Sequence, residues 1–336
     1  MITFRGQHGP LLIAEIGGNH EGDFETALRL TDLAIDAGAD AVKFQIYYGD
    51  TLVSGAESAD RNAHFKRFEL TPAQHLELAQ RVLAADRDYI ASVWDLAAFN
   101  WITPVLSACK IGSGDLTAPP FIRAAADTGK PLIVSTGLSD MAEIRDAVDL
   151  IRRRNPTYRD PAKLAVLQCT SMYPIAESDA QLSVMKSLAA LDVTVGYSDH
   201  TIGIRALEVA AAMGAAVLEF HFTDRKEGRS FRDHQLSLDE SDLRRLTRAL
   251  DEIRVLKGSG QKTPLDIEIA NEHPTSFRRA VYPARDIVAG EVLDDHNLCV
   301  LRPNHGIDAR EYDSVIGRRA KRFLHRHQPL DWQDIE

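Results

Sequence analysis

The chain has 336 residues, of which 44% are hydrophobic and 26% are charged, as in an ordinary soluble globular protein. Its formal net charge is −10 and it has no block of lysine and arginine, which argues against nucleic-acid binding. No run approaches 18 apolar residues and the first residues form no apolar signal core, so we expect a cytoplasmic protein without a membrane segment. Three widely spaced cysteines, an odd number, favour reduced thiols.

Eight short apolar runs recur between Leu11 and Phe222, and stretches of helical period separate them. A strand followed by a helix, repeated eight times, predicts an α/β fold, a closed parallel (β/α)8 TIM barrel. The expected strands are Leu11–Ile16, Asp40–Gln45, Tyr89–Val93, Ala108–Ser113, Pro131–Thr136, Leu164–Cys169, Asp192–Ser198 and Ala216–Phe222.

Helix signals follow most of these runs. The expected helices include Phe24–Ala37 with Asp23 as its N-cap, Ala73–Ala85, Met141–Arg154 and Ser237–Leu256. In the last of these, Ser237 and Glu240 have the spacing of a capping box. The stretch Tyr47–Leu70 is long and polar for a loop after a strand, and we expect it to be a lid over the substrate.

The character of the chain changes after Leu256, where a Gly-, Ser- and Pro-containing stretch begins. We expect a barrel domain of residues 1–258, a linker of residues 259–276 and a small β-rich domain of residues 277–336. A domain of about 60 residues is near the lower size limit for independent folding. Its expected β segments are Arg279–Tyr282, Asp286–Ile287, Leu298–Leu301 and Ala320–Leu324.

Two histidines end neighbouring strands of the expected barrel, where the active site of such a fold lies. His200 and His221 each have the same parity as inward-facing residues of their strands, so they are expected to meet. Two imidazoles that lie close together can hold one divalent cation, Mn²⁺ or Mg²⁺, with water or substrate completing the coordination shell. The alternative is that each histidine is a separate hydrogen-bonded polar residue without a ligand.

Glu15 ends the first strand, and closure of the barrel places it beside His221. A carboxylate there could orient a water molecule, take up a proton or stabilise positive charge in a transition state. The alternative is a carboxylate paired with Lys43 for structural reasons alone.

Cationic and hydroxyl side chains lie at the ends of several other strands, together with glycine-exposed backbone amides. Such groups provide charge and short-range donors without steric bulk, which is what a phosphate requires. We therefore expect a phosphorylated anion beside the metal. The residues concerned are Lys43, Gln45, Lys110, Ser113, Ser135 and Ser198, with Tyr173 as a wall or further hydroxyl and Asp233 either capping a helix or lining the rim.

Taken together, the motifs resemble those of the sialic acid synthase family. They are Ile-Ala-Glu-Ile-Gly-Gly-Asn-His (13–20), Val-Lys-Phe-Gln (42–45), Lys-Ile-Gly-Ser-Gly-Asp (110–115), Ser-Thr-Gly (135–137), Tyr-Ser-Asp-His-Thr (197–201) and Glu-Phe-His-Phe-Thr-Asp (219–224). The tail, with Arg-Arg-Ala-Val-Tyr (278–282) and Leu-Arg-Pro (301–303), resembles that family's antifreeze-like (SAF) domain. The motifs occur in the same order over nearly the whole chain.

The resemblance implies a metal-dependent enzyme that condenses phosphoenolpyruvate with an N-acylated hexosamine, usually N-acetylmannosamine. The products are a nine-carbon 2-keto acid and phosphate. By this resemblance, His200 and His221 bind metal, Glu15 lies at the reacting centre, and Lys43, Lys110, Ser113, Ser135 and Ser198 hold phosphoenolpyruvate. It also implies a domain-swapped homodimer in which Arg302 reaches the N-acyl group of the partner's sugar.

The sequence departs from the family pattern in several places. Trp94 stands in Ser92-Val-Trp-Asp95, where the family commonly has Ser-Thr-Pro-Phe, while Ser171 replaces a common asparagine and Phe220 replaces a usual basic residue. These departures leave open which sugar is used, and a synthase of legionaminic or pseudaminic acid type is one alternative. A pyruvate-dependent aldolase and a barrel that binds a sugar or protein without turnover are the others.

Overall fold

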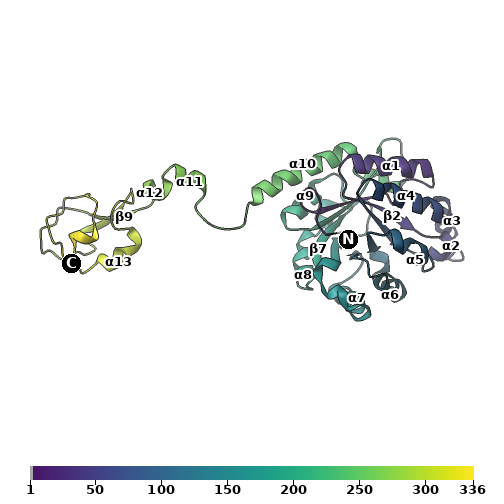
Figure 1. Ribbon diagram of the computed structural model, residues 1–336, viewed down its shortest axis with the longest axis horizontal. Coiled ribbons are helices and arrows are strands. Elements are labelled where there is room, and N and C mark those ends of the chain that lie inside the picture. Colours follow the sequence, from purple (N-terminus) through teal and green to yellow (C-terminus); the bar gives the residue numbers. More distant parts are fainter. Residues whose placement is uncertain (1–2) are drawn as a thin grey trace. The chain divides into compact units, whose positions relative to one another are not determined.

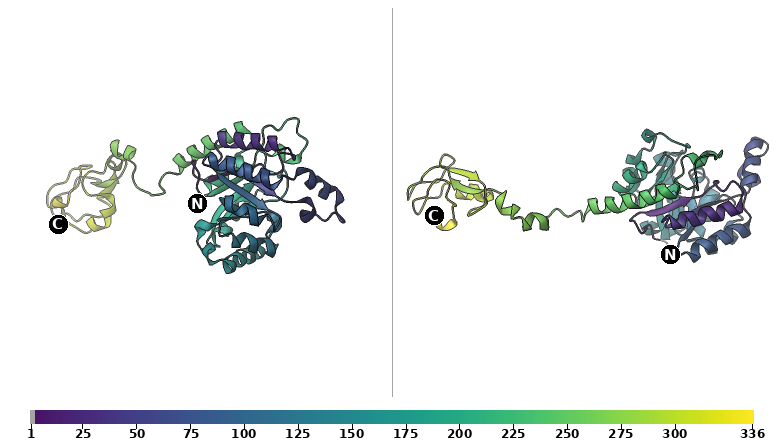
Figure 2. Two further views of the ribbon diagram at one scale, coloured as in Figure 1. Left: turned by 45° about the vertical axis from the view of Figure 1, so that its right-hand side comes forward. Right: turned by 90° about the horizontal axis from the view of Figure 1, so that it is seen from above.

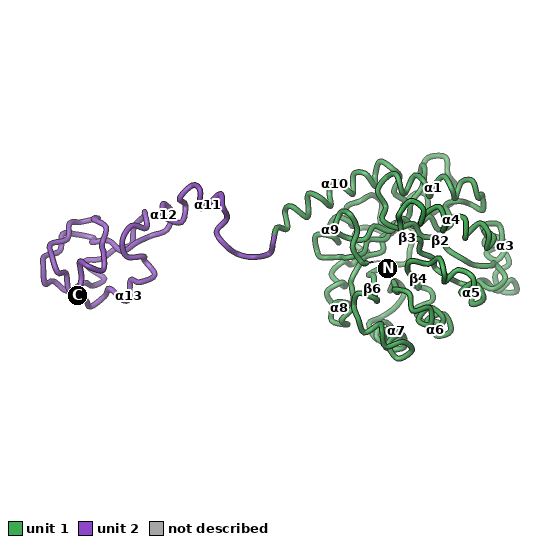
Figure 3. The backbone as a smooth tube through the Cα atoms, viewed as in Figure 1, with its two compact units in different colours: residues 1–258 green, residues 259–336 purple. Residues whose placement is uncertain are grey.

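The computed structural model describes residues 3–336, which form two compact units, residues 3–258 and residues 259–336 (Figure 3). The first unit is a closed barrel of eight parallel strands in the order β1 to β8, with β8 paired to β1 (Figure 1). The predicted TIM barrel is therefore confirmed. The strands are β1 Leu11–Glu15, β2 Ala41–Ile46, β3 Asp88–Val93, β4 Ala108–Ile111, β5 Leu132–Ser135, β6 Leu164–Cys169, β7 Thr194–Asp199 and β8 Val217–His221.

Helices surround the strands of the first unit (Figure 1). They are α1 Phe24–Asp36, α2 Gly49–Leu52, α3 Ala59–Phe68, α4 Pro72–Ala84, α5 Phe99–Ile102, α6 Pro119–Asp127, α7 Met141–Arg154, α8 Met185–Ala189, α9 Arg205–Ala212 and α10 Glu240–Lys257. Asp23 caps α1, as predicted, by accepting a hydrogen bond from the Thr26 amide.

The predicted capping box at Ser237 and Glu240 is wrong. Asp239 is the N-cap of α10 and accepts a hydrogen bond from the Asp242 amide at 2.9 Å. Ser237 instead donates to the carbonyl oxygen of Asp233, because it lies in the turn before the helix. The sequence contains two overlapping capping patterns, and the fold uses the later one.

The barrel interior is layered. Small and branched apolar side chains fill its lower part and are almost completely buried: Leu11, Ile13, Ala41, Ile90, Ala108, Ile133, Ala165, Leu167 and Val217. Two residues further along several of these strands, the side chains become polar, as in Glu15, Lys43 and Lys110. Strand alternation brings them to the same side of the sheet as the apolar layer, so they form its upper layer.

The expected lid, Tyr47–Leu70, contains two helices rather than an irregular loop. Helices α2 and α3 project beyond the ring of helices around the barrel (Figure 2). Asn62 of α3 fixes the segment, because its side-chain amide donates to the carbonyl oxygens of Gly49 at 2.9 Å and Val53 at 2.8 Å.

The second unit has its own apolar core around Val281, Leu298 and Leu324. Its strands β9 Ala280–Pro283 and β10 Leu298–Leu301 pair antiparallel, and α13 spans Tyr312–Val315. The expected strands at 286–287 and 320–324 are not formed as strands, since Ile287 and Leu324 make only an isolated bridge. The segment expected to be a linker contains two short helices, α11 Asp266–Ala270 and α12 His273–Ser276.

Within residues 3–336, every helix is too short or too polar to cross a lipid bilayer.

Candidate active site

A cavity of about 470 Å³ opens at the carboxyl ends of the barrel strands. The residues that the sequence predicted and that line it are Glu15, Lys43, Gln45, Lys110, Ser113, Ser135, Tyr173, Ser198, His200 and His221. These residues come from seven strands or the loops after them, and the barrel closure brings them together. Asp233 lies outside this lining, and Arg302 belongs to the second unit.

Two lysines and two glutamates form the floor of the cavity. Lys43 Nζ lies 2.5 Å from Glu15 Oε2 and 3.8 Å from Glu219 Oε2, while Lys110 Nζ lies 3.4 Å from Glu219 Oε1. All four side chains are at most 8% exposed. Charges removed from water to this degree require partners, and each of these has at least one of opposite sign.

The environment separates the pKa values of the two carboxyl groups. Burial raises the pKa of Glu15, and Lys43 only partly opposes this effect. Burial would also raise the pKa of Glu219, but Lys110 and Lys43 outweigh it and lower the pKa to about 2. Glu219 is therefore the fixed negative charge of the cavity floor, and Glu15 takes up a proton more readily than Glu219 does.

Glu219 was not identified as a site residue from the sequence. It accepts a hydrogen bond from Ser198 Oγ at 2.8 Å and contacts both lysines. The sequence nevertheless contained a sign of its position. Glu219 lies two residues before His221 on β8, so both side chains point to the same side of the strand, into the barrel.

Hydroxyl groups surround the two ammonium groups. Lys110 Nζ donates to Ser135 Oγ at 2.7 Å, and Lys43 Nζ lies 3.4 Å from Ser92 Oγ. In the loop after β5, the Gly137 amide donates a hydrogen bond to Ser113 Oγ at 3.0 Å. The two lysines and the serine hydroxyls thus face one volume and provide donors that an oxyanion requires, while the Gly137 amide holds Ser113 in place.

The two predicted histidines meet at the other side of the cavity. The ring centroids of His200 and His221 are 5.4 Å apart, and the Tyr173 ring packs 4.1 Å from His200. His200 Nδ1 lies 2.7 Å from the Thr170 carbonyl oxygen, which leaves Nε2 as the acceptor nitrogen. Burial lowers the pKa of His221 to about 4, so this imidazole is neutral at pH 7.

The histidine pair fits a metal site with open positions. His221 Nδ1 is buried without a hydrogen-bond partner, and the nearest carboxylate oxygen, Asp233 Oδ2, is 3.9 Å away. In the described chain, no three His, Cys, Asp or Glu side chains are close enough to hold an ion by themselves. Two imidazoles together with water or substrate oxygens are thus the ligand set that these residues can supply.

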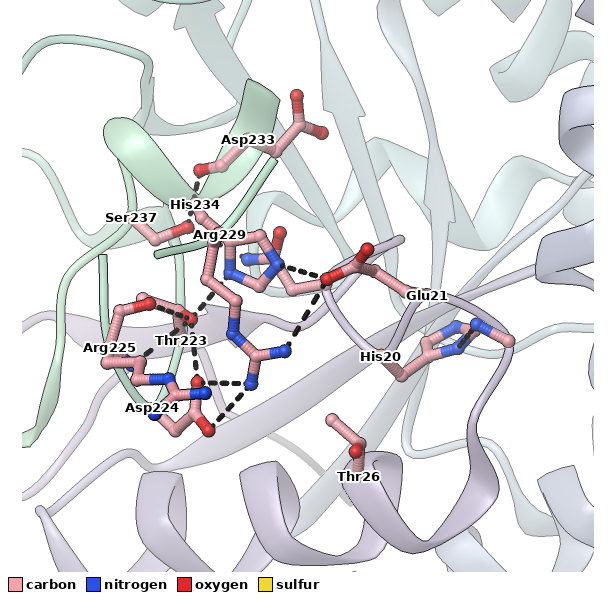
Figure 4. A network of polar contacts seen from close by, with 12 residues as sticks. His20, Glu21, Thr26, Thr223, Asp224, Arg225, Arg229, Asp233, His234 and Ser237 are labelled. Atoms are coloured by element: carbon pink, nitrogen blue, oxygen red, sulfur yellow. Dashed lines mark hydrogen bonds and ion pairs between the residues drawn. The ribbon is translucent and has the colours of Figure 1, made fainter. Parts of the chain in front are cut away.

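A polar network holds the loop between β8 and α10 that carries Asp233. Arg229 pairs with Asp224 at 2.8 Å and with Glu21 at 3.5 Å, and His234 Nε2 lies 3.2 Å from the same Glu21 oxygen (Figure 4). Thr223 Oγ1 contacts His234 Nδ1 at 2.7 Å. The Asp233 carboxylate points away from this network (Figure 4). The network therefore fixes the loop to the segment after β1 and leaves Asp233 near His221.

Trp94 lines the cavity, at a position where the sequence departs from the family pattern. Its ring stacks on Tyr47 at 5.6 Å, and Asp115 lies beside it. Burial raises the pKa of Asp115 to about 6. Phe220, another departure, is 2% exposed and belongs to the apolar core, so it does not enter the cavity.

A closed parallel barrel with charged, hydroxyl and imidazole side chains converging at its carboxyl end defines a TIM-barrel enzyme site. The comparisons with known proteins identify the family. The NeuB family model matches residues 30–262, and the SAF domain model matches residues 278–336. The chain belongs to the NeuB family and carries a C-terminal SAF domain.

Several similar proteins span almost the same length. The chain is 34% identical to N,N'-diacetyllegionaminic acid synthase of Legionella pneumophila, over 97% of this chain and 94% of that protein. It is 28% identical to pseudaminic acid synthase of Helicobacter pylori, over 97% and 98%. The crystal structure of N-acetylneuraminic acid synthetase from Leptospira borgpetersenii superposes with a TM-score of 0.73 at 30% identity, over 79% of this chain and 91% of that chain.

The expectation of an enzyme, a phosphoenolpyruvate-dependent synthase that acts on an amino sugar, is confirmed at the level of the family. These similar proteins make different nine-carbon sugar acids, so similarity at this level gives the class of product and not the particular sugar.

Proposed function

We propose that this protein condenses phosphoenolpyruvate with the open-chain aldehyde of an N-acylated amino hexose, releasing a nine-carbon 2-keto sugar acid and phosphate. One observation carries the proposal. Two buried lysines, several serine hydroxyls, a carboxyl pair and two imidazoles line a single cavity at the carboxyl end of the barrel. This arrangement suits an anionic substrate on one side and a polarised carbonyl on the other.

Lys43, Lys110, Ser113, Ser135 and Ser198 hold the phosphate and carboxylate groups of phosphoenolpyruvate in this proposal. Lys110 and Ser135 already contact each other at 2.7 Å, so a bound oxyanion would meet an ammonium and a hydroxyl side by side. Because burial lowers the pKa of Lys110 and Glu219 only partly opposes this, an incoming anion would favour the protonated lysine.

His200 and His221 would hold the divalent cation, Mn²⁺ or Mg²⁺. When bound, the ion supplies Lewis-acid polarisation of the aldehyde oxygen. The chain's own residues determine how that ion is held: the Thr170 carbonyl orients the His200 ring, and Tyr173 packs against both imidazoles.

Glu15 is the residue we place at the reacting centre. Carbon 3 of phosphoenolpyruvate bonds to the aldehyde carbon, positive charge develops at carbon 2, water adds there, and phosphate leaves with cleavage of the C–O bond. Gln45 donates a hydrogen bond to Glu15 Oε1 at 2.6 Å, and Lys43 contacts the other oxygen. A carboxylate held in this way can stabilise the charge at carbon 2 and accept a proton from the added water.

The chain resembles legionaminic and pseudaminic acid synthases over nearly its whole length. This similarity favours an amino sugar with two acylamino groups over N-acetylmannosamine as the substrate of this protein.

The domain-swapped homodimer, in which Arg302 reaches the partner's sugar, remains a prediction of the family resemblance. An unchanged KM for the sugar in Arg302→Ala would contradict it.

The test is phosphate release by the purified full chain with Mn²⁺, phosphoenolpyruvate and a panel of acylated amino hexoses. We expect release only when both substrates are present, and loss of turnover and of Mn²⁺ dependence in His221→Ala with an unchanged melting temperature. His64→Ala is the matched control, because His64 lies outside the cavity lining. Failure of every sugar in the panel would refute the proposal, and carbon–carbon bond formation from pyruvate alone would favour the aldolase alternative.

A further inference from the structure

A second cavity lies at the opposite end of the barrel from the candidate active site. Its volume is about 360 Å³, and its lining includes Pro10, just before β1, and Ala216, just before β8. These residues mark the amino ends of the strands, whereas the candidate active site opens at their carboxyl ends. The described lining of this cavity shares no residue with that of the active site. Small-molecule sites usually have volumes of about 300 to 1,000 Å³, so the cavity is large enough for a small ligand.

The segment before β1 forms one wall of this cavity, and two aspartates hold it in place. Asp40 accepts a hydrogen bond from the Gln7 amide at 3.0 Å, and Asp251 Oδ2 of α10 lies 2.9 Å from His8 Nδ1. Phe4 of the same segment is 6% exposed and packs in the apolar layer inside the barrel. The wall is therefore ordered before a ligand binds, which lowers the entropic cost of binding.

The helices that end beside this segment supply apolar surface. Ala211 belongs to the last turn of α9, and Ala215 follows the end of that helix. Leu250 and Ile253 belong to α10. Apolar side chains of this kind favour a ligand that has an apolar body, because contact with them removes apolar surface from water.

Every polar side chain in the described lining is basic, although the chain as a whole has a net charge of −10. These side chains are Arg5, His8, Arg254 and Lys257. His8 and Arg254 share one carboxylate, since Asp251 lies 2.9 Å from His8 Nδ1 and 3.0 Å from Arg254 Nη2. Within residues 3–336, Arg5 and Lys257 have no carboxylate partner.

Arg5 and Lys257 thus have donors available to a ligand. The one hydrogen bond of Lys257 Nζ in the described chain goes to the Ala211 carbonyl oxygen at 3.3 Å, and that oxygen already accepts a shorter bond from the Gly214 amide. Arg5 makes no side-chain hydrogen bond in the same part of the chain. The dipole of α10 accounts for a basic residue in its last turn, such as Lys257, but not for Arg5, which comes from the segment before β1. A negatively charged ligand accounts for both.

We propose that this cavity is a binding site for a small organic anion, with a carboxylate or phosphate group on a compact apolar body. The anionic group accepts hydrogen bonds from Arg5 and Lys257, and the apolar body packs on Ala211, Ala215 and Ile253. An inorganic anion would leave the apolar surface unused, and a neutral ligand would leave the two cations without a partner. The site lies apart from the proposed reaction, so its ligand is not one of the substrates proposed above.

The experiment is isothermal titration calorimetry of the full-length protein with four test ligands: phenyl phosphate, benzoate, inorganic phosphate and benzyl alcohol. We expect phenyl phosphate or benzoate to bind roughly tenfold or more tightly than the other two, because only they combine an anionic group with an apolar body. Whichever of the two binds more tightly identifies the anionic group as phosphate or carboxylate. Failure of both to bind, or an equal affinity for inorganic phosphate or benzyl alcohol, would overturn the proposal.

Variants then show where the tighter ligand binds. Arg5→Met and Lys257→Met should each weaken binding roughly twofold to fivefold, the range of exposed ion pairs, and the double variant roughly tenfold. Arg248→Met is the matched control, because Arg248 is exposed on α10 but outside the cavity lining, and it should leave the affinity unchanged. An unchanged affinity in the double variant would contradict the proposal.

Lys110→Met separates this site from the active site, which also holds anions in the proposed function. An unchanged affinity in Lys110→Met supports a site at the amino end of the barrel, whereas loss of binding would assign the ligand to the active site and overturn the proposal. Both titrations measure binding without turnover, so their outcome does not depend on whether the proposed reaction takes place.

Discussion

The free energy of unfolding of the barrel should fall at acid pH, and a large part of that fall should come from one histidine that has no role in the proposed mechanism. His75 of α4 is 1% exposed and packs between the rings of Phe44 and Trp101, with its Nδ1 3.4 Å from the Tyr89 hydroxyl. Burial lowers its pKa from 6.5 to about 3. The imidazole is therefore neutral in the folded state at every pH at which the enzyme is expected to work.

The sign and size of the effect follow from proton linkage. Below pH 6.5 the unfolded chain binds a proton at this position and the folded chain does not, so the free energy of unfolding falls as the pH is lowered and the fall ends near pH 3. Between pH 8 and pH 5 the loss from His75 alone amounts to about 2 kcal/mol. In His75→Gln, which cannot be protonated, this part of the loss should disappear.

The measurement is urea unfolding at pH 8 and pH 5, followed by tryptophan fluorescence in a Trp332→Phe background. Trp94 and Trp101, the two remaining tryptophans, both report on the barrel. His64→Gln is the control, since His64 is only half-buried and its loss should change the pH dependence much less. If wild type and His75→Gln lost equal stability on acidification, the reasoning about burial would be refuted.

The remaining predictions concern the anion side of the cavity. Lys110→Met removes the ammonium beside Ser135, and the KM for phosphoenolpyruvate should rise roughly tenfold to a hundredfold with little change in the KM for the sugar, as measured by phosphate release. An equal rise in both KM values would show that Lys110 acts on the whole cavity. Gly137→Ala would place a Cβ atom 2.2 Å from Ser171 Oγ and 2.9 Å from Ser113 Oγ, so these hydroxyls must move. It should also raise the KM for phosphoenolpyruvate, as measured by the same phosphate release.

The pairing of strand ends could be predicted because barrel closure is a strong constraint. Once eight strands are assigned, β1 must lie beside β8, and the register pairs Glu15 directly with His221. The inward parity of His200 and His221 follows from alternation along β7 and β8 in the same way. Glu15 and His221 could be found from the sequence because each is the last residue of its strand, and His200 because it directly follows the end of β7.

Contacts that cross the barrel could not be predicted from strand patterns. Glu219 bridges Lys43 of β2 and Lys110 of β4, and neither strand is a neighbour of β8. Strand order gives neighbours but not which side chains reach across the interior. The part of the cavity lining that α3 supplies was missed for a different reason: the segment Tyr47–Leu70 was expected to be a lid loop, and only a helix gives Arg61 and Phe65, four residues apart, a common face.

The charge pattern explains how a protein with a net charge of −10 can provide a site for an anion. At physiological salt, exposed charges are screened beyond about 8 Å, so surface carboxylates exert little repulsion at the cavity floor. Within the floor the two ammonium and two carboxylate groups balance in the absence of substrate. Lys110 has Glu219 as its one carboxylate partner in the described chain, at 3.4 Å, and a closer contact with Ser135. In the proposed reaction, an incoming phosphate can therefore take the position beside Lys110 without breaking the tight pair of Lys43 and Glu15, and Glu15 stays where we propose that it meets the reacting carbon.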